Sequence, residues 1–223
     1  MVAKTQESLP LDLHRAALLC IDLQHLCCTP GVGGLAHLDE CDWSTGRYAW
    51  FIKRINDQVL PTTRRLQQQF RRGGLEVIHV RVQSLTQDGR DRSYQHRRLG
   101  SLAAPGSREA EFLDGIEPQG DELIINKTAC SVFNSTNIHY VLSNLGIEAL
   151  VLVGCETSEC IESAARDASD LGYRVYVVED GVASYYREDH ENALSALHHT
   201  FASIVTEQEV IAELGGVMPP PDS

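Results

Sequence analysis

The chain has 223 residues, of which 19 are lysine or arginine and 31 are aspartate or glutamate, so it carries a formal net charge of −12 at neutral pH. This negative charge opposes attachment to nucleic acid and to anionic membranes. The longest apolar runs are too short to cross a bilayer, and the N-terminus lacks the basic-then-apolar layout of a signal peptide. We therefore expect a soluble, cytoplasmic protein that binds neither nucleic acid nor membranes.

The length suits one domain with one substantial core. We expect residues 1–223 to form that domain, with a core at residues 16–214 and a disordered, proline-rich tail at 217–223. Seven cysteines at irregular positions favour free thiols over a disulfide scaffold. Two arginine clusters interrupt the acidic balance, and we interpret them as a solvated helix face and a solvated loop rather than anion sites: Arg64, Arg65, Arg71 and Arg72, and Arg90, Arg92, Arg97 and Arg98.

Short apolar runs alternate with longer segments of helical period, which is typical of a parallel sheet covered on both faces. In chain order, we predict a strand at 16–22, a helix that includes 51–70, a strand at 76–82, a polar excursion at 83–121, a strand at 123–126, a helix at 136–144, a strand at 149–154, a helix at 161–171, a strand at 174–178, a helix at 190–199, a strand at 202–205 and a helix at 207–214. Pro61 should kink or split the first helix. The predicted fold is a three-layer αβα, Rossmann-like arrangement around an open, mostly parallel sheet of about six strands.

Three chemically active side chains fall at the carboxyl ends of the predicted strands, where open α/β sheets bind their ligands. Asp22 closes the first strand, Lys127 follows the third, and Cys160 lies just past the fourth. A helix's first turn and a nearby cation both favour the thiolate, and a carboxylate can take the thiol proton and pass it to a leaving amine. Each residue alone also fits a structural role, as a buried cysteine, a turn aspartate or a surface lysine. Their joint position favours a cysteine nucleophile.

The segments around these residues read LLCIDLQ at 18–24, INKTACSVFNST at 125–136 and GCETSECIESAARDASDLGYRVYVVEDGVAS at 154–184. They resemble the isochorismatase-like cysteine hydrolases, a family with nicotinamidases, N-carbamoylsarcosine amidohydrolases, biuret and ureidoacrylate hydrolases and isochorismatase itself. The resemblance covers residues 16–205, and its most specific part is the Gly-x-x-Thr-x-x-Cys turn that ends at Cys160. It implies the isochorismatase-like hydrolase fold.

The resemblance also implies roles for individual residues. Cys160 would be the nucleophile, Asp22 the general acid and base, and Lys127 the charge partner. A cis peptide bond between Cys155 and Glu156 would direct the main-chain N–H groups of Glu156 and Cys160 at an oxyanion. The implied reaction cleaves a C–N bond of a small linear amide, ureido or carbamoyl compound through a thioester, without a cofactor, in a homodimer or homotetramer. A catalytically silent ligand-binding or regulatory protein on the same fold is the alternative.

Other members of this family narrow the expected chemistry. Nicotinamidases hold a metal with an Asp-x-His pair and a further histidine, whereas Asp88 and Asp91 have no histidine at the matching spacing and His96 stands alone. We therefore expect no metal ion. Isochorismatase itself acts on a vinyl ether without the cysteine nucleophile, so Cys160 favours an amide. A nucleotide-binding Rossmann protein is disfavoured, because no Gly-x-Gly-x-x-Gly follows the first strand.

Five further residues are candidate substrate contacts. Gln24 either bonds substrate or orders its loop, and Arg81 pairs with either a substrate carboxylate or a neighbouring acid. Phe133 either lines the pocket or belongs to the core, and the remaining candidates are Asn134 and Thr157. Cys27 and Cys28 are adjacent in a loop near the site, as redox-sensitive thiols or as free surface thiols.

Overall fold

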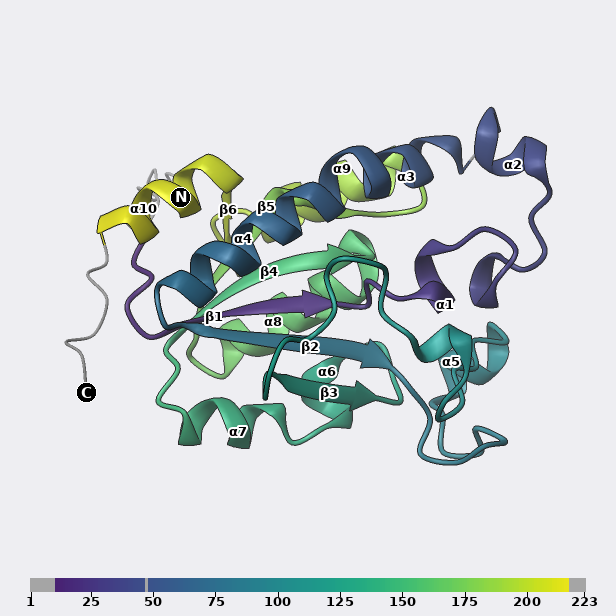
Figure 1. Ribbon diagram of the computed structural model, residues 1–223, viewed down its shortest axis with the longest axis horizontal. Helices are drawn as coiled ribbons and strands as arrows, with labels where there is room; N and C mark the ends of the chain where they lie inside the picture. The colour runs from purple at the N-terminus through teal and green to yellow at the C-terminus, as the bar shows by residue number, and fades with distance from the viewer. Residues whose placement is uncertain (1–10, 47, 217–223) are drawn as a thin grey trace, which may run out of the picture.

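Six parallel strands form the single sheet of the computed structural model, which describes residues 11–46 and 48–216 (Figure 1). The strands are β1 (Ala16–Ile21), β2 (Glu76–Val82), β3 (Leu123–Lys127), β4 (Ala149–Cys155), β5 (Arg174–Ala183) and β6 (Ser203–Val205). Their order is β3-β2-β1-β4-β5-β6, and every neighbouring pair is parallel. The predicted α/β class is confirmed, and the predicted tail at 217–223 lies outside the described residues.

Helices cover both faces of this sheet and also lie beyond the ends of its strands. They are α1 (His25–Cys28), α2 (Glu40–Ser44), α3 (Ala49–Arg54), α4 (Leu60–Arg72), α5 (Tyr94–Arg98), α6 (Val132–Ser135), α7 (Ile138–Asn144), α8 (Glu162–Asp170), α9 (Arg187–Leu197) and α10 (Glu207–Gly216). Of these, α1, α2 and α5 lie beyond the ends of the strands (Figure 1). Apolar side chains of α4 and α10 pack on one face, and those of α7 and α8 pack on the other. Every residue of β1 is therefore buried, because its alternate side chains point into two cores.

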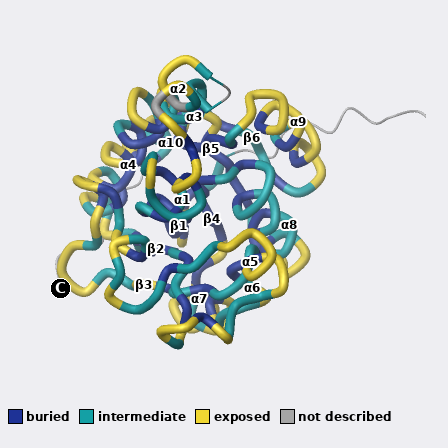
Figure 2. The backbone as a smooth tube through the Cα atoms, turned by 90° about the vertical axis from the view of Figure 1, so that its right-hand side faces the viewer, coloured by how far each residue is buried: buried dark blue, intermediate teal, exposed yellow. Residues whose placement is uncertain are grey.

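The strand order reverses between β1 and β4, which lie side by side in the middle of the sheet. Gly154, near the end of β4, has a φ of +128°, and a Cβ atom there would lie 1.9 Å from the carbonyl oxygen of Ile21. No side chain fits in that gap. The arrows of β1 to β4 in Figure 1 all point toward the end of the molecule where α1 and α5 lie, and Figure 2 looks onto this end.

The helix that contains Pro61 is not split, in contrast to the prediction, but it changes locally from an α-helix to a π-helix. The chain runs continuously from α3 through a wider π-helical turn, Ile55–Val59, into α4, where Pro61 stands in the first turn. A proline has no N–H to donate, and the wider turn accommodates the bond that is missing. Phe51 packs in a cluster with Leu23 near the strand ends, whereas Phe70 packs against the sheet. The continuous helix from α3 to α4 thus contributes side chains to two apolar clusters.

Other boundaries also differ from the predictions. β5 continues five residues beyond the predicted end at 178, because Val182 and Ala183 pair with β4 after a register shift that leaves the run 179–181 without a partner in that strand. α9 starts at Arg187 and ends before His198 and His199. The excursion at 83–121 contains α5 and a short 3-10 turn, Arg108–Ala110. Within the part of the chain that is described, no helix is long and apolar enough to cross a bilayer.

Candidate active site

Asp22 follows the last residue of β1 and is 1% exposed. Its φ of +55° turns the chain out of the strand, and its N–H donates to the carbonyl of Val80 at 2.9 Å. Oδ2 lies 2.8 Å from Nζ of Lys127. Oδ1 accepts no hydrogen bond from any described residue. The carboxylate is thus held on one side and open on the other.

Lys127 is the last residue of β3, and its side chain is fully buried. Besides the ion pair with Asp22, Nζ donates to the carbonyls of Ala129 and Cys130 at 3.1 and 3.0 Å and to Sγ of Cys160 at 3.2 Å. Burial alone would lower the pKa of Lys127, but the charges of Asp22 and Cys160 outweigh it and raise that pKa. The ammonium therefore stays charged between a carboxylate and a sulfur.

Cys160 lies in a π-helical turn, Thr157–Ile161, that leads into α8. Its Sγ is 3.8 Å from Sγ of Cys130, whose sulfur also lies 3.5 Å from Oγ of Ser163. The hydrogen bond between the two sulfurs lowers the pKa of Cys130 to about 7 and raises the pKa of Cys160. The two thiols titrate together, so the first proton belongs to the pair. Lys127 donates to Cys160, so its ammonium can stabilise the thiolate that Cys160 forms when it loses its proton.

Two main-chain N–H groups, those of Glu156 and Cys160, are the candidate oxyanion donors beside the thiol. The carbonyl of Glu156 accepts from the N–H groups of Glu159 and Ile161, both at 3.1 Å, and not from that of Cys160. The N–H of Glu156 donates to no backbone carbonyl among the described residues. The peptide bond between Cys155 and Glu156 is cis, at the position that the family resemblance implies.

A cavity of about 350 Å³ opens above Asp22 and Cys160. Its other lining residues are Leu26, Cys27, Gly34, Leu35, His37, Tyr48, Val82, His96, Leu99, Ser101, Cys155, Glu156, Ser158, Glu159, Tyr185, Tyr186 and Asp189. The walls come from α1, α5, the turn at Cys160 and the start of α9. The volume suits a small molecule.

Comparison with known proteins places this site in a family. A model of the isochorismatase domain matches residues 16–209. The chain belongs to the isochorismatase family. It is 32% identical over 109 residues to maleamate amidohydrolase of Pseudomonas putida, a match that covers 49% of this chain and 51% of that protein. It is 40% identical over 81 residues to ureidoacrylate amidohydrolase RutB of Agrobacterium fabrum, which covers 36% of each chain.

The chain thus spans about half the length, or less, of these two curated relatives. A similarity in structure extends much further. The cysteine hydrolase from Pseudomonas syringae pv. phaseolicola superposes with a TM-score of 0.79, over 97% of this chain and 100% of that one, at 22% sequence identity. At this identity the likeness shows the fold alone, which is the isochorismatase-like hydrolase fold.

Within this isochorismatase-family site, two candidate substrate contacts turn away from the cavity. The Gln24 amide is fully buried and donates to the carbonyls of Val82 and Glu109 at 2.9 and 2.7 Å, while its oxygen accepts from the N–H of Val82 at 2.6 Å. Gln24 therefore orders its loop. Arg81 donates to Oδ1 of Asn126 and to the carbonyl of Ala110, both at 2.8 Å, so it meets neither the cavity nor a neighbouring acid.

Three further candidates also lie outside the cavity lining. Phe133 packs against the core and near the ring of Tyr173. Asn134 is exposed, and its amide donates to Asp167 at 3.0 Å. Thr157 is buried and shares a 2.8 Å hydrogen bond with Nδ1 of His190, which ties the Cys160 turn to α9. Each of the three has a structural partner in place of a substrate.

The residues that were weighed as metal ligands are dispersed. Asp88 pairs with Arg90, and Asp91 accepts hydrogen bonds from Leu85 and Thr86. His96 instead lines the cavity. No group of three potential ligands in the described ranges is arranged to hold a metal ion. The position of His96 in the cavity was not predictable, because it depends on the path of the 83–121 segment.

The loop thiols differ from each other. Cys27 lines the cavity and is partly exposed. Cys28 is buried, and its Sγ lies 3.5 Å from Sγ of Cys155. The reading of Cys28 as a surface thiol is therefore wrong, because α1 turns it under the loop onto the end of β4.

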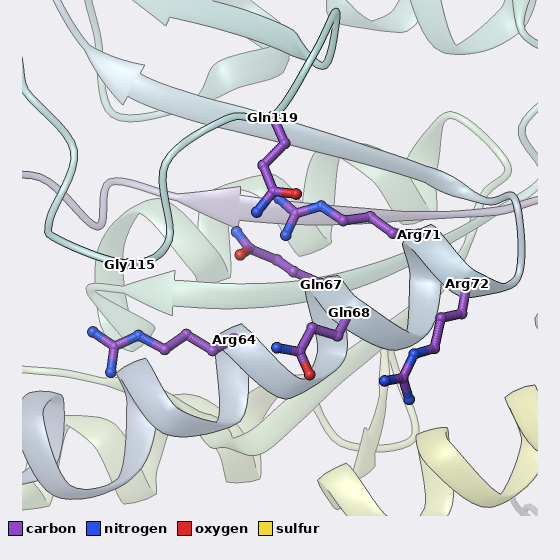
Figure 3. A pocket seen from close by; sticks show the side chains of 7 residues that line it. All are labelled: Arg64, Gln67, Gln68, Arg71, Arg72, Gly115 and Gln119. Atoms are coloured by element: carbon purple, nitrogen blue, oxygen red, sulfur yellow. The ribbon is translucent and has the colours of Figure 1, made fainter.

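A second hollow of about 350 Å³ lies along the outer side of α4, as Figure 3 shows. Arg64 and Arg72 are exposed there, as expected for a solvated helix face. Arg71 is an exception, because it forms a two-point ion pair with Glu122 at 2.6 and 2.9 Å. Residues of α4, together with Gly115 and Gln119, line this hollow. It has no lining residue in common with the cavity above Cys160.

Proposed function

We propose that the chain is a cysteine hydrolase that cleaves a carbon–nitrogen bond of a small linear amide, ureido or carbamoyl compound. The observation that carries this proposal is the position of Lys127, whose Nζ lies 2.8 Å from Asp22 and 3.2 Å from Cys160. Asp22 and Cys160 line a cavity of about 350 Å³, and the buried Lys127 ammonium contacts both. The amidohydrolase names of two relatives support the class of bond.

The first half of the reaction forms a thioester. Asp22 takes the proton of Cys160, and the thiolate attacks the carbonyl carbon while Lys127 stabilises the negative charge. The N–H groups of Glu156 and Cys160 hold the oxyanion of the tetrahedral intermediate. Asp22 then gives its proton to the leaving nitrogen, the C–N bond breaks, and ammonia or an amine departs.

The second half releases the acid. Water enters the cavity, Asp22 takes a proton from it, and the resulting hydroxide attacks the thioester carbonyl. The same two N–H groups hold the second oxyanion. The C–S bond breaks, the product leaves as a carboxylic or carbamic acid, and Cys160 takes back its proton from Asp22.

The proposed mechanism uses no metal ion. Each charged group of the Asp22, Lys127 and Cys160 set already has a protein partner: the Asp22 carboxylate pairs with Lys127, and Lys127 donates to Cys160. A metal ion bound to Asp22 would have to displace the buried ammonium. We likewise propose that the protein is cytoplasmic. We also propose that it acts as a homodimer or homotetramer, and light scattering on the purified protein measures this oligomeric state.

A catalytically silent binding or regulatory protein on this fold is the alternative. It would need no buried ammonium beside the thiol, and removing an ion pair from water is costly even when the two charges compensate each other. The presence of the complete Asp22, Lys127 and Cys160 set favours the enzyme.

The test measures ammonia release from a panel of small amides, ureido acids and carbamoyl compounds. We expect turnover of at least one class by the unaltered protein and none by Cys160→Ala, with an unchanged circular dichroism spectrum. Acid quenching during turnover should trap an acyl group on Cys160 by mass spectrometry. Full activity in Cys160→Ala, or no turnover of any compound together with no adduct, rejects the proposal.

A further inference from the structure

The cavity above Cys160 is walled by groups that accept hydrogen bonds or carry negative charge. Besides Asp22 on its floor, three carboxyl groups line it: Glu156 and Glu159 from the Cys160 turn and Asp189 from the first turn of α9. No lysine or arginine among the described residues lines it. The buried Lys127 is already paired with Asp22 and bonded to Cys160.

Three tyrosines form the neighbouring part of the wall. The ring centroids of Tyr48 and Tyr185 are 5.5 Å apart at an interplanar angle of 78°, and those of Tyr48 and Tyr186 are 5.7 Å apart. All three residues line the cavity. The electron-rich face of a tyrosine ring attracts a cation, more strongly when water is excluded.

His96 independently indicates that a ligand with hydrogen-bonding groups fits here. It is 6% exposed and lines the cavity, and its Nδ1 has no hydrogen-bond partner among the described residues. Burial, together with the charge of Lys127, lowers the pKa of His96 to about 4, so the imidazole is neutral. A buried nitrogen without a partner is costly unless a ligand or water satisfies it.

The same walls disfavour a substrate with a carboxylate at its far end. Such a group would lie among Glu156, Glu159 and Asp189, and Arg81 is held outside the cavity by Asn126 and Ala110. The negative potential already acts on Glu156: burial first, and then the charge of Glu159, raise the pKa of Glu156 to about 8. A cation would relieve this repulsion, whereas an anion would add to it.

We propose that the substrate is an amide whose end remote from the scissile bond carries a positive charge, held by the carboxylates of Glu159 and Asp189 and by the ring of Tyr185. This inference rests on the proposed amide hydrolysis at Cys160. If it is correct, this chain differs in substrate charge from any relative that binds an anionic amide.

The first test compares three amides of nearly equal size and different charge: γ-aminobutyramide, pentanamide and succinamate. We expect kcat/KM to fall in that order, by roughly tenfold from the cation to the neutral amide. Asp189→Asn and Glu159→Gln should each reduce the ratio of cationic to neutral kcat/KM by roughly three- to tenfold. Glu188→Gln is the matched control, since Glu188 is the exposed neighbour of Asp189 and does not line the cavity. It should leave the ratio unchanged.

The second test does not need turnover. Bromoethylamine, iodoacetamide and iodoacetate alkylate thiols and differ in charge, and each rate at Cys160 is divided by the rate with glutathione. We expect bromoethylamine to be favoured, with the modified cysteine identified by peptide mass spectrometry. Arg47, which precedes Tyr48 and lies outside the described residues, is tested directly as Arg47→Gln.

The outcomes separate the two proposals. Preference for succinamate and iodoacetate overturns the charge inference and leaves the hydrolase proposal standing, and loss of that preference in Arg47→Gln would assign it to that arginine. Equal rates for all three charges also overturn the inference. Selective alkylation by bromoethylamine without hydrolysis of any amide would support a cation-selective cavity and reject the hydrolase. Failure of both assays rejects both.

Discussion

Lys127 and Asp22 form an ion pair with a 2.8 Å separation, and their side chains are 0% and 1% exposed. The pair joins β3 to β1 across the end of β2, which lies between them in the sheet. Two charges that have left water are stable only together, since either one alone would be buried without compensation. The pair therefore couples the chemistry of the site to the stability of the fold.

Lys127→Met should destabilise the protein by about 3–5 kcal/mol, because it leaves the Asp22 carboxylate buried without its partner. Urea denaturation followed by circular dichroism measures the change. Lys53→Met is the control, because the ion pair of Lys53 with Asp57 is exposed on a helix surface. It should leave the midpoint close to that of the unaltered protein, and an equal effect of both substitutions would contradict the prediction.

Asp22→Asn should reduce kcat/KM by roughly 100-fold or more, since the amide keeps the shape of the side chain but cannot shuttle a proton. Lys127 then has only the sulfur to neutralise, and the negative charge that opposes the thiolate is gone. Iodoacetamide should therefore alkylate Cys160 at lower pH than in the unaltered protein. Unchanged turnover, or a shift of the alkylation profile to higher pH, would show that Asp22 has another role.

Cys130→Ala should move the pH profile of Cys160 alkylation downward, because the hydrogen bond to Cys130 and the charge of Cys130 both raise the pKa of Cys160. The rate of reaction with iodoacetamide against pH gives the profile. Cys41→Ala removes an exposed thiol and serves as the control. A profile that coincides with that of the unaltered protein would mean that the two sulfurs do not share a proton.

Glu156→Gln should flatten the pH dependence of the free energy of unfolding between pH 4.5 and about pH 8. The pKa of Glu156 is raised from 4.5 to about 8, mainly by burial, so the folded state keeps a proton that the unfolded state has lost. The unaltered protein should therefore lose stability as the pH rises through this interval, and glutamine removes that loss. Melting temperatures across the interval measure it, with Glu188→Gln as the control. Parallel curves for Glu156→Gln and the unaltered protein would contradict the raised pKa.

Gln24→Leu should destabilise the protein by about 2–4 kcal/mol, because it leaves main-chain groups of Val82 and Glu109 buried without their partner. Gln68→Leu on the exposed side of α4 should change stability little. A Gln24→Leu protein of normal stability but with a raised KM would restore Gln24 as a substrate contact.

The sequence was sufficient to predict those site residues whose position is set by the end of a strand. Asp22, Lys127 and Cys160 follow strands of a parallel sheet, and the carboxyl ends of such strands meet at one edge, so their convergence needs no knowledge of the loops. Arg81 could not be placed in this way. It stands in register with Asn126 on the neighbouring strand, and the two side chains bond to each other. A sheet that is covered on both faces gives no alternation of polarity that would show where such a side chain points.

The residues that line the walls of the cavity could not be predicted from sequence patterns. His96 comes from the 83–121 segment, and Tyr48, Glu159 and Asp189 come from three other places in the chain. Their meeting depends on loop paths, which hydrophobic periodicity does not encode. The full length of β5 was missed for a related reason, because Glu179 and Asp180 interrupt the apolar run before Val182 and Ala183 pair with β4 again.

Gly154 limits how this site can be altered. A hydrogen atom at that position sets the distance between β1 and β4 where Asp22 and Cys155 emerge, and any larger group would meet the Ile21 carbonyl. A larger residue at Gly154 must therefore push these two strands apart. The rim is built on separate loops and helix ends, where Tyr48, Glu159 and Asp189 can change without moving a strand. Selection for new substrates should accumulate changes at the rim and leave the floor untouched.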